Sequence, residues 1–137
     1  MCQALLSAMK TYPLYLNGEF VTSEPAWEVR NPASGETFAR VSTIDRGRLA
    51  QALADAHAAF AGWRQLTAKA RGEYLRRIAS ELERRRDEVA RLISTENGKP
   101  LAQSLAEVAL SVDHLQWFAE EGRRAYGRSR GPQPNQD

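Results

Sequence analysis

The sequence predicts an α+β fold in which two short β-hairpins are followed by three helices. Two turn signals, Asn17-Gly18 and the segment 31–35, each separate a pair of extended stretches, and apolar residues recur at helical spacing after residue 42. The chain has 137 residues, of which 42% are hydrophobic and 26% charged, as in one ordinary globular domain. This composition excludes collagen-like, disulfide-rich and wholly disordered chains.

Charge and cysteine content narrow the class of protein further. Nineteen basic and 17 acidic side chains leave a net charge of +2, which is weak support for a nucleic-acid or anionic-membrane partner. The single cysteine, Cys2, cannot form an intrachain disulfide. The first ten residues contain no basic segment ahead of their apolar patch, and no run reaches the roughly 18 apolar residues of a membrane span. We therefore expect a cytoplasmic protein with no membrane partner.

The first hairpin is predicted over the sequence LYLNGEFV, from Leu14 to Val21, because Asn-Gly tolerates the positive φ angles of a type I′ turn. The second pairs residues 27–30 with residues 36–41. Pro32 favours a turn between them, and Gly35 provides a flexible exit from it. Hairpins this short are marginal by themselves, so we expect them to lie against another part of the protein.

Start and stop signals delimit three helices. The first is expected to begin near Ser42, where Ser42-x-x-Asp45 resembles a capping box. The second begins after Thr67 and ends at Asn97-Gly98. The third begins at Pro100 and ends near Gly127. Their apolar stripes are Leu49, Leu53, Ala56, Phe60 and Trp63; Leu75, Ile78, Ala79, Leu82, Val89 and Ile93; and Leu101, Leu105, Val108, Val112, Leu115 and Ala119.

The third helix carries a second stripe on the side opposite its main apolar face. At about 100° per residue this stripe contains Gln103, Leu110, His114, Trp117 and Glu121. Two interpretations stay open. Trp117 leans across a neighbouring helix, or another piece of protein or a ligand channel covers this face.

No catalytic constellation is evident in the sequence. Cys2 lies in the terminal segment, without a basic partner that would lower its thiol pKa. His57 and His114 fall on different helices, outside any metal-ligand spacing. Neither GxGxxG nor GxxxxGK[ST] occurs, so a glycine-rich nucleotide cradle is absent from the sequence. The run Arg84–Arg86 is interleaved with acidic residues, which predicts a solvated, ion-paired helix face rather than a phosphate-binding surface.

Four stretches together resemble the amino-terminal part of NAD(P)-dependent aldehyde dehydrogenases, collinearly from Leu14 to Gly127. They read LYLNGEFV, EVRNPASGETFARVS, ALADAHAAFAGWRQLTAKARGEYLRRIASELERRRDEVARLISTENGKPLAQSLAEV and LQWFAEEGRRAYG. The segment Trp117–Gly122, followed by Tyr126-Gly127, looks most like the succinate-semialdehyde dehydrogenase branch. The resemblance implies that the hairpins and helices are the first part of a Rossmann-type α/β enzyme.

The resemblance also implies a reaction. A cysteine thiolate adds to the aldehyde carbonyl, the adduct passes a hydride to NAD or NADP, and a glutamate-activated water releases the acid. The family's nucleophile, general base and cofactor loop match nothing in these residues, so we expect no catalytic or cofactor-binding residue and no cofactor binding by this chain alone. We expect an incomplete domain over residues 13–127, between a flexible terminus (1–12) and a polar tail (128–137).

Only peripheral site residues can be carried over from the family. Some members bind a monovalent cation through backbone oxygens that match Val29 and Arg30 and an acidic residue that matches Glu96. The third helix lines the aldehyde entrance tunnel, which assigns Leu110, His114 and Trp117 to it. The complete enzyme is expected to be a homo-oligomer. The alternative function is a stand-alone helical interaction module that docks through the Leu110/Trp117 face; nucleic-acid binding ranks last.

Overall fold

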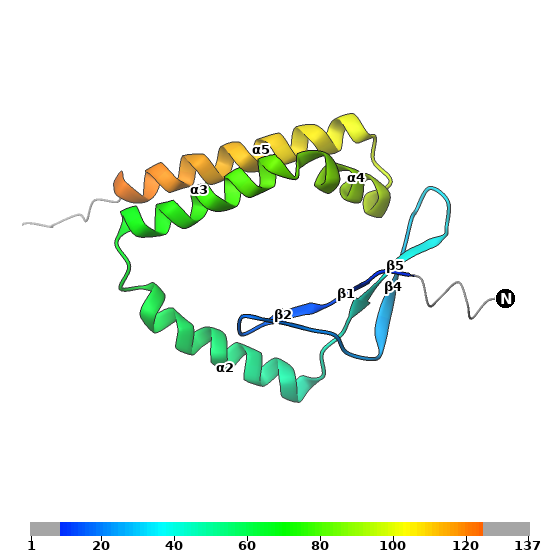
Figure 1. The fold of residues 1–137 in the computed structure, drawn as a ribbon, viewed down its shortest axis with the longest axis horizontal. Helices are drawn as coiled ribbons and strands as arrows, with labels where there is room; N and C mark the ends of the chain where they lie inside the picture. The colour runs from blue at the N-terminus through cyan, green and yellow to red at the C-terminus, as the bar shows by residue number, and fades with distance from the viewer. Residues whose placement is uncertain (1–8, 125–137) are drawn as a thin grey trace, which may run out of the picture.

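A computed structural model describes residues 9–124 of the chain (Figure 1). In this part a three-stranded sheet of order β1-β5-β4, a separate two-stranded sheet β2-β3 and four α-helices are present. The strands are β1 (Thr11–Tyr12), β2 (Leu14–Leu16), β3 (Glu19–Val21), β4 (Ala26–Arg30) and β5 (Thr37–Ser42). The helices are α2 (Arg46–Trp63), α3 (Ala68–Arg84), α4 (Arg86–Asn97) and α5 (Leu101–Glu121), followed by the 3-10 turn η1 (Gly122–Arg124).

Both predicted hairpins are confirmed. β2 and β3 pair antiparallel around Asn17 and Gly18, whose φ angles of 47° and 88° are those of a type I′ turn. β4 and β5 pair antiparallel, with a register shift between Val29 and Arg30. The two-residue strand β1 was not predicted; it runs parallel to β5, with Thr11 opposite Arg40.

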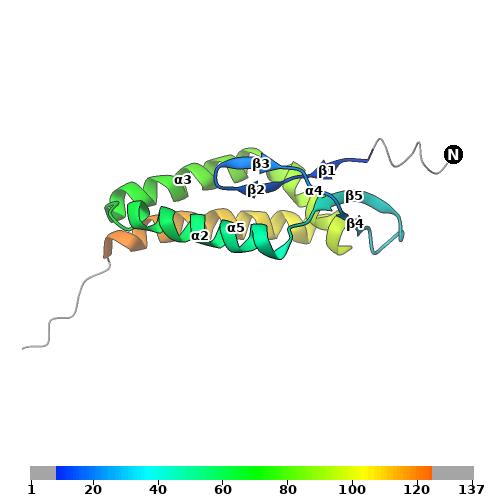
Figure 2. The ribbon, with the colours of Figure 1, turned by 90° about the horizontal axis from the view of Figure 1, so that it is seen from below.

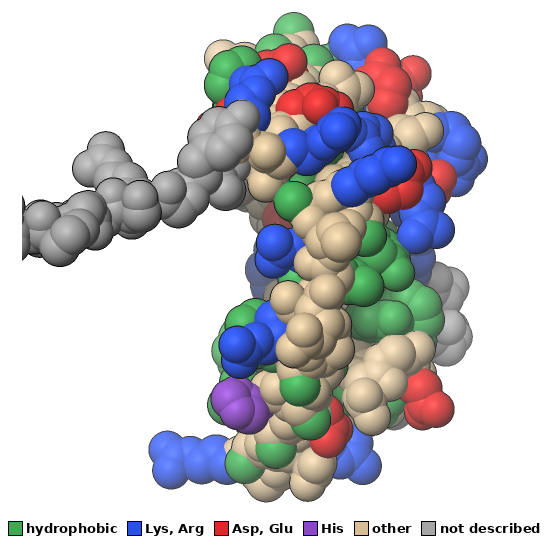
Figure 3. Space-filling model, turned by 90° about the vertical axis from the view of Figure 1, so that its left-hand side faces the viewer, with side chains coloured by type: hydrophobic (Ala, Val, Ile, Leu, Met, Phe, Trp, Pro, Cys, Tyr) green, Lys and Arg blue, Asp and Glu red, His purple; other side chains and the backbone are tan. Residues whose placement is uncertain are grey.

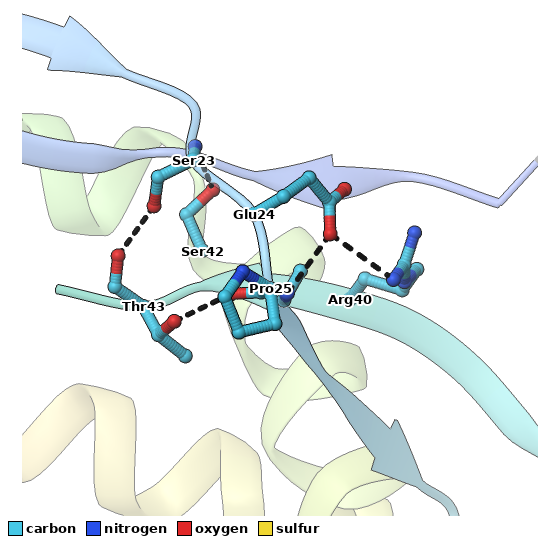
Figure 4. A network of polar contacts seen from close by, with 7 residues as sticks. Ser23, Glu24, Pro25, Arg40, Ser42 and Thr43 are labelled. Carbon is cyan, nitrogen blue, oxygen red and sulfur yellow. Dashed lines mark hydrogen bonds and ion pairs between the residues drawn. The ribbon is translucent and has the colours of Figure 1, made fainter. Parts of the chain in front are cut away.

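Hydrogen bonds fix the connection from β3 to β4 against the end of β5 (Figure 4). The backbone N–H of Ser23 donates to Ser42 Oγ over 3.2 Å, and the Ser23 hydroxyl donates to the carbonyl of Thr43. The Thr43 hydroxyl donates in turn to the carbonyl of Pro25. Glu24 accepts from Arg40 over 3.5 Å. The connection therefore holds the chain in place where it leaves the sheet for α2.

The predicted start of the first helix at Ser42 is wrong. Ser42 is the last residue of β5 and is buried, while Asp45 caps α2 by accepting a 2.9 Å hydrogen bond from the backbone N–H of Arg48. This bond, together with the Arg48 charge, lowers the pKa of the Asp45 carboxyl below its ordinary value.

The single helix predicted between Thr67 and Asn97 is divided in two. Arg85, at φ −101° and ψ 16°, leaves helical geometry and separates α3 from α4. The predicted ends are confirmed: the Thr67 hydroxyl caps α3, and Gly98 closes α4 in the left-handed conformation. α5 begins after Pro100 as predicted, and the predicted stop at Gly127 lies outside the described residues.

The core lies where α5 packs against α3 and α4. Its buried residues are small: Ala79, Ala90, Ser104, Val108, Val112 and Ala119. Small side chains allow the helix backbones to approach closely. Figures 1 and 2 show these three helices forming one layer, with α2 lying apart from it and the β2–β3 hairpin between. α2 contains no buried residue.

Candidate functional site

The outer face of α5 carries the three residues that the family resemblance assigns to the aldehyde entrance tunnel. Leu110 and Trp117 are 55% and 60% exposed, and His114 is exposed between them. Val108 and Val112 are buried on the opposite side. The second stripe predicted from periodicity therefore exists, and Trp117 is not covered by a neighbouring helix. This face offers an apolar surface with one imidazole.

The inner face of α5 fixes the position of its backbone. A Cβ atom at Gly72 of α3 would stand 2.6 Å from the carbonyl oxygen of Ala119, so the two helices touch at this point without an intervening side chain. At the other end the hydroxyls of Ser94 and Ser104 share a 2.9 Å hydrogen bond between α4 and α5. A helix held at both ends presents its outer side chains at defined positions.

An ion pair across α3 and α5 adds to this attachment. Arg76 donates to Glu120 over 2.6 Å and to Glu73 over 3.1 Å. The hydrogen bond to Glu120 raises the pKa of Arg76, and the same bond lowers the pKa of Glu120. The two residues line a groove of about 600 Å³ between the helices. Sequence reasoning missed this pair, because partners 44 positions apart leave no periodic signal.

The structure brings two of the three predicted cation-binding positions together. Val29 of β4 and Glu96 of α4 line one cavity of about 200 Å³, whose other walls are Tyr12, Phe38, Ala39, Val41 and Leu92. Arg30 does not line this cavity; its guanidinium pairs with Glu28 over 3.1 Å. Leu110, His114 and Trp117 of α5 do not line it either. The predicted cation-binding residues and the predicted tunnel residues therefore lie at separate sites.

Two residues of the arginine run, Arg84 and Arg85, are ion-paired, as predicted. Arg84 pairs with Glu81 and Arg85 with Glu88, each over 2.6 Å, and these bonds lower the pKa of both carboxylates. In Figure 3 basic and acidic side chains intermix over the upper helices, while hydrophobic side chains are exposed between those helices and α2. An intermixed surface of this kind is a solvated helix face rather than a phosphate-binding patch.

The described residues lack the glycine-rich turn between a strand and a helix that typically cradles a dinucleotide. β5 passes into α2 through residues 43–45, a connection without glycine, and across residues 9–124 no strand leads through a glycine-rich turn into a helix. Nor, in the same part of the chain, do three or more His, Cys, Asp or Glu side chains gather as a metal cluster. Cys2 lies outside this part. None of the helices seen is both long and apolar enough to cross a membrane.

A family pattern and individual relatives both relate this chain to aldehyde dehydrogenases. Residues 20–137 match the pattern of the family described as "Aldehyde dehydrogenase family". The chain is 38% identical over 115 residues to a glutarate-semialdehyde dehydrogenase of Pseudomonas putida, a match that covers 82% of this chain and 24% of that protein. The chain thus spans about a quarter of the length of such relatives.

Solved structures agree in fold. The lactaldehyde dehydrogenase of Escherichia coli superposes with a TM-score of 0.86 and 29% identity over 93% of this chain and 27% of its own. The succinate-semialdehyde dehydrogenase of Burkholderia pseudomallei superposes with a TM-score of 0.83 and 37% identity over 90% of this chain and 26% of its own. The order of hairpins and helices, the sequence match and these superpositions lead to one conclusion: the chain belongs to the aldehyde dehydrogenase family and corresponds to the amino-terminal part of its fold.

Proposed function

We propose that this chain is the scaffold part of an enzyme that oxidises succinate semialdehyde to succinate with NAD or NADP. In that reaction the aldehyde and water yield the carboxylate, and the cofactor accepts the hydride. The outer face of α5 carries the proposal: Leu110, His114 and Trp117 would form one wall of the path by which the aldehyde enters. Relatives named for succinate semialdehyde and for glutarate semialdehyde support a short acidic aldehyde as substrate.

The reacting groups would come from residues other than those described. Residues 9–124 contain no glycine-rich turn from a strand into a helix, so the proposal gives this chain the tasks of positioning the entrance wall and supporting the fold. The purified chain should therefore bind neither NAD nor NADP and should not reduce either one in the presence of succinate semialdehyde. Saturable turnover by the chain alone would contradict this part of the proposal.

The entrance wall is tested in a single-chain chimera in which this chain replaces the matching part of the Burkholderia succinate-semialdehyde dehydrogenase. Trp117→Ala should raise KM for succinate semialdehyde about tenfold, the equivalent of about 1.4 kcal/mol of lost apolar contact. Phe118→Ala is the matched control, because Phe118 is equally exposed but lies about 100° further around α5. Equal effects of the two changes would contradict the entrance-wall role.

We further propose that Val29, Arg30 and Glu96 together bind a monovalent cation in the complete enzyme, at the edge of the cavity that Val29 and Glu96 line. Backbone oxygens at Val29 and Arg30, with the Glu96 carboxylate, are the hard oxygen ligands that such an ion prefers. The chimera should then melt at a higher temperature in potassium or sodium chloride than in choline chloride. Glu96→Gln should remove the difference, while Glu83→Gln, on α3, should keep it.

A further inference from the structure

The turn of the β2–β3 hairpin exposes an asparagine that is followed by a glycine. Asn17 and Gly18 are both exposed, and a Cβ atom placed on Gly18 would meet nothing within 4 Å. The N–H of Gly18 makes no backbone hydrogen bond within residues 9–124. The side-chain amide of Asn17 and the backbone nitrogen that follows it are therefore open to water and to base.

This pair of groups has a chemistry of its own. Once deprotonated, the backbone nitrogen after an asparagine attacks the side-chain carbonyl carbon and forms a C–N bond, and the side-chain amide leaves as ammonia. Water then opens the resulting five-membered imide at one of its two carbonyl carbons. Opening at the side-chain carbon gives aspartate. Opening at the backbone carbon gives isoaspartate, whose main chain runs through the former side chain. Glycine hinders the attack least because it has no side chain.

The hairpin leaves the turn free to reach the geometry of ring closure. The sheet of β2 and β3 has only two strands, joined over three residue pairs. A hairpin of this size is marginally stable by itself, so its tip opens at low cost. Opening the pair next to the turn, Leu16 with Glu19, is enough to let the backbone of Asn17 rotate.

The chain contains a second Asn-Gly pair, Asn97-Gly98, in a different setting. Asn97 is the last residue of α4, and the N–H of Gly98 donates to the carbonyl of Ser94 over 2.9 Å. A Cβ atom on Gly98 would lie 2.9 Å from Pro32 Cγ, so this glycine is also crowded. The nitrogen of Gly98 reaches the Asn97 side chain only after its helical hydrogen bond is broken.

The third asparagine in the described chain lacks the nucleophile. Asn31 is followed by Pro32, whose backbone nitrogen carries no hydrogen to lose. The side-chain oxygen of Asn31 also accepts a 2.9 Å hydrogen bond from the N–H of Ala33. Asn17 is thus the asparagine of residues 9–124 that combines a free nitrogen, open space and a turn that can open.

We infer that Asn17 is a site of spontaneous deamidation, at which the folded chain accumulates aspartate and isoaspartate ahead of Asn97 and Asn31. The isoaspartate product adds a carbon atom to a two-residue turn whose length fixes the strand pairing. The contact of Tyr15 with Phe20, whose ring centroids lie 5.1 Å apart across the hairpin, should be lost in this product. The aspartate product should keep the contact, because aspartate also adopts a positive φ.

The test follows the full purified chain by peptide mass spectrometry during incubation in mildly alkaline buffer, folded and in guanidinium chloride. Each reacted asparagine exchanges an NH group for oxygen, and this mass gain locates the site. In the folded chain Asn17 should react at least about tenfold faster than Asn97, because the Gly98 hydrogen bond must break first. In guanidinium chloride most of this difference should disappear, since both sites are Asn-Gly.

Labelling by an isoaspartyl methyltransferase gives a second readout. The aged wild type should be labelled, and Asn17→Gly should lose most of the label, because Gly-Gly also suits the turn but has no side chain to react. Asn97→Ala is the matched control and should keep the label. Three results would overturn the inference: equal rates at Asn17 and Asn97 in the folded chain, no mass gain at Asn17 while the denatured chain reacts, or full labelling of Asn17→Gly.

Discussion

Glycine at position 72 sets how closely α3 and α5 approach. The α3 backbone lies against the Ala119 carbonyl, where a Cβ atom would come within 2.6 Å of the oxygen. Backbone atoms cannot rotate away as a long side chain can. The close contact therefore exists only because residue 72 has no side chain.

Gly72→Ala should destabilise the chain by about 1–3 kcal/mol, since the helices must separate to admit the methyl group. Gly62→Ala is the control, because a Cβ atom there meets nothing within 4 Å and α2 is helical at that position. It should be neutral or stabilising by about 0.5–1 kcal/mol. Urea unfolding followed by circular dichroism measures both, and a stabilised Gly72→Ala would contradict the contact.

Gly98 combines a left-handed backbone with a contact to the turn between β4 and β5. Its φ is +73°, and a Cβ atom would lie 2.9 Å from Pro32 Cγ. Gly98→Ala should lower the free energy of unfolding by about 1–2 kcal/mol because alanine disfavours the left-handed conformation. The clash of the new methyl group with Pro32 should lower it further. Gly35→Ala measures the conformational effect alone, since Gly35 has φ +74° and open space around it. Thermal melts should show the larger loss at Gly98, and the added change Pro32→Ala should reduce it.

At the scale of elements, most local signals in the sequence predict the structure correctly, with the capping signal at Ser42 as the exception, and long-range contacts leave no such signal. Asn17-Gly18, Thr67 and Pro100 each act on the backbone within a few residues of their own position, so the hairpin, the α3 cap and the start of α5 were predictable. The break at Arg85 was missed because arginine is a good helix former and the apolar stripe continues past it. Strand β1 was missed because two residues carry no period and its partner β5 lies far along the chain.

The ion pair between α3 and α5 makes the helix layer acid-sensitive. Its hydrogen bond holds the pKa of Glu120 below the ordinary 4.5. A carboxylate whose pKa is lowered by folding stabilises the protein above its unfolded pKa, and that stability is lost as pH falls through the folded value. Stability against urea should therefore decline less below pH 4.5 in Glu120→Gln than in the wild type. Glu19→Gln, in β3, should decline like the wild type.

At the scale of the whole molecule, the candidate site was only partly predictable. Helical periodicity placed Leu110, His114 and Trp117 on one exposed face because the geometry of a helix is local. Val29 and Glu96 were paired through the family resemblance, since a strand and a helix 67 positions apart share no spacing rule. That α2 buries none of its residues within residues 9–124 could not be predicted from its stripe, which is the stripe of an ordinary core helix.

Because α2 buries no residue and α5 buries several, the two helices should open locally at different rates. Amides of α2 should exchange with solvent much faster than those around Val108 and Val112, because local opening of α2 exposes no buried side chain. Hydrogen-exchange mass spectrometry of the isolated chain measures this directly. Equal protection of α2 and α5 would show that α2 is covered in solution. In the chimera, protection of α2 should rise toward that of α5.

The packing of α5 against α3 and α4 affects the order in which the chain folds during translation. These three helices follow one another in the sequence, so we expect their contacts to form once Glu121 has left the ribosome. α2 is made before them and has no such partner at hand. In a nascent chain, the layer of α3, α4 and α5 would then be assembled while the apolar side chains of α2 are still accessible to chaperones. Burial of α2 would be the late step in biogenesis.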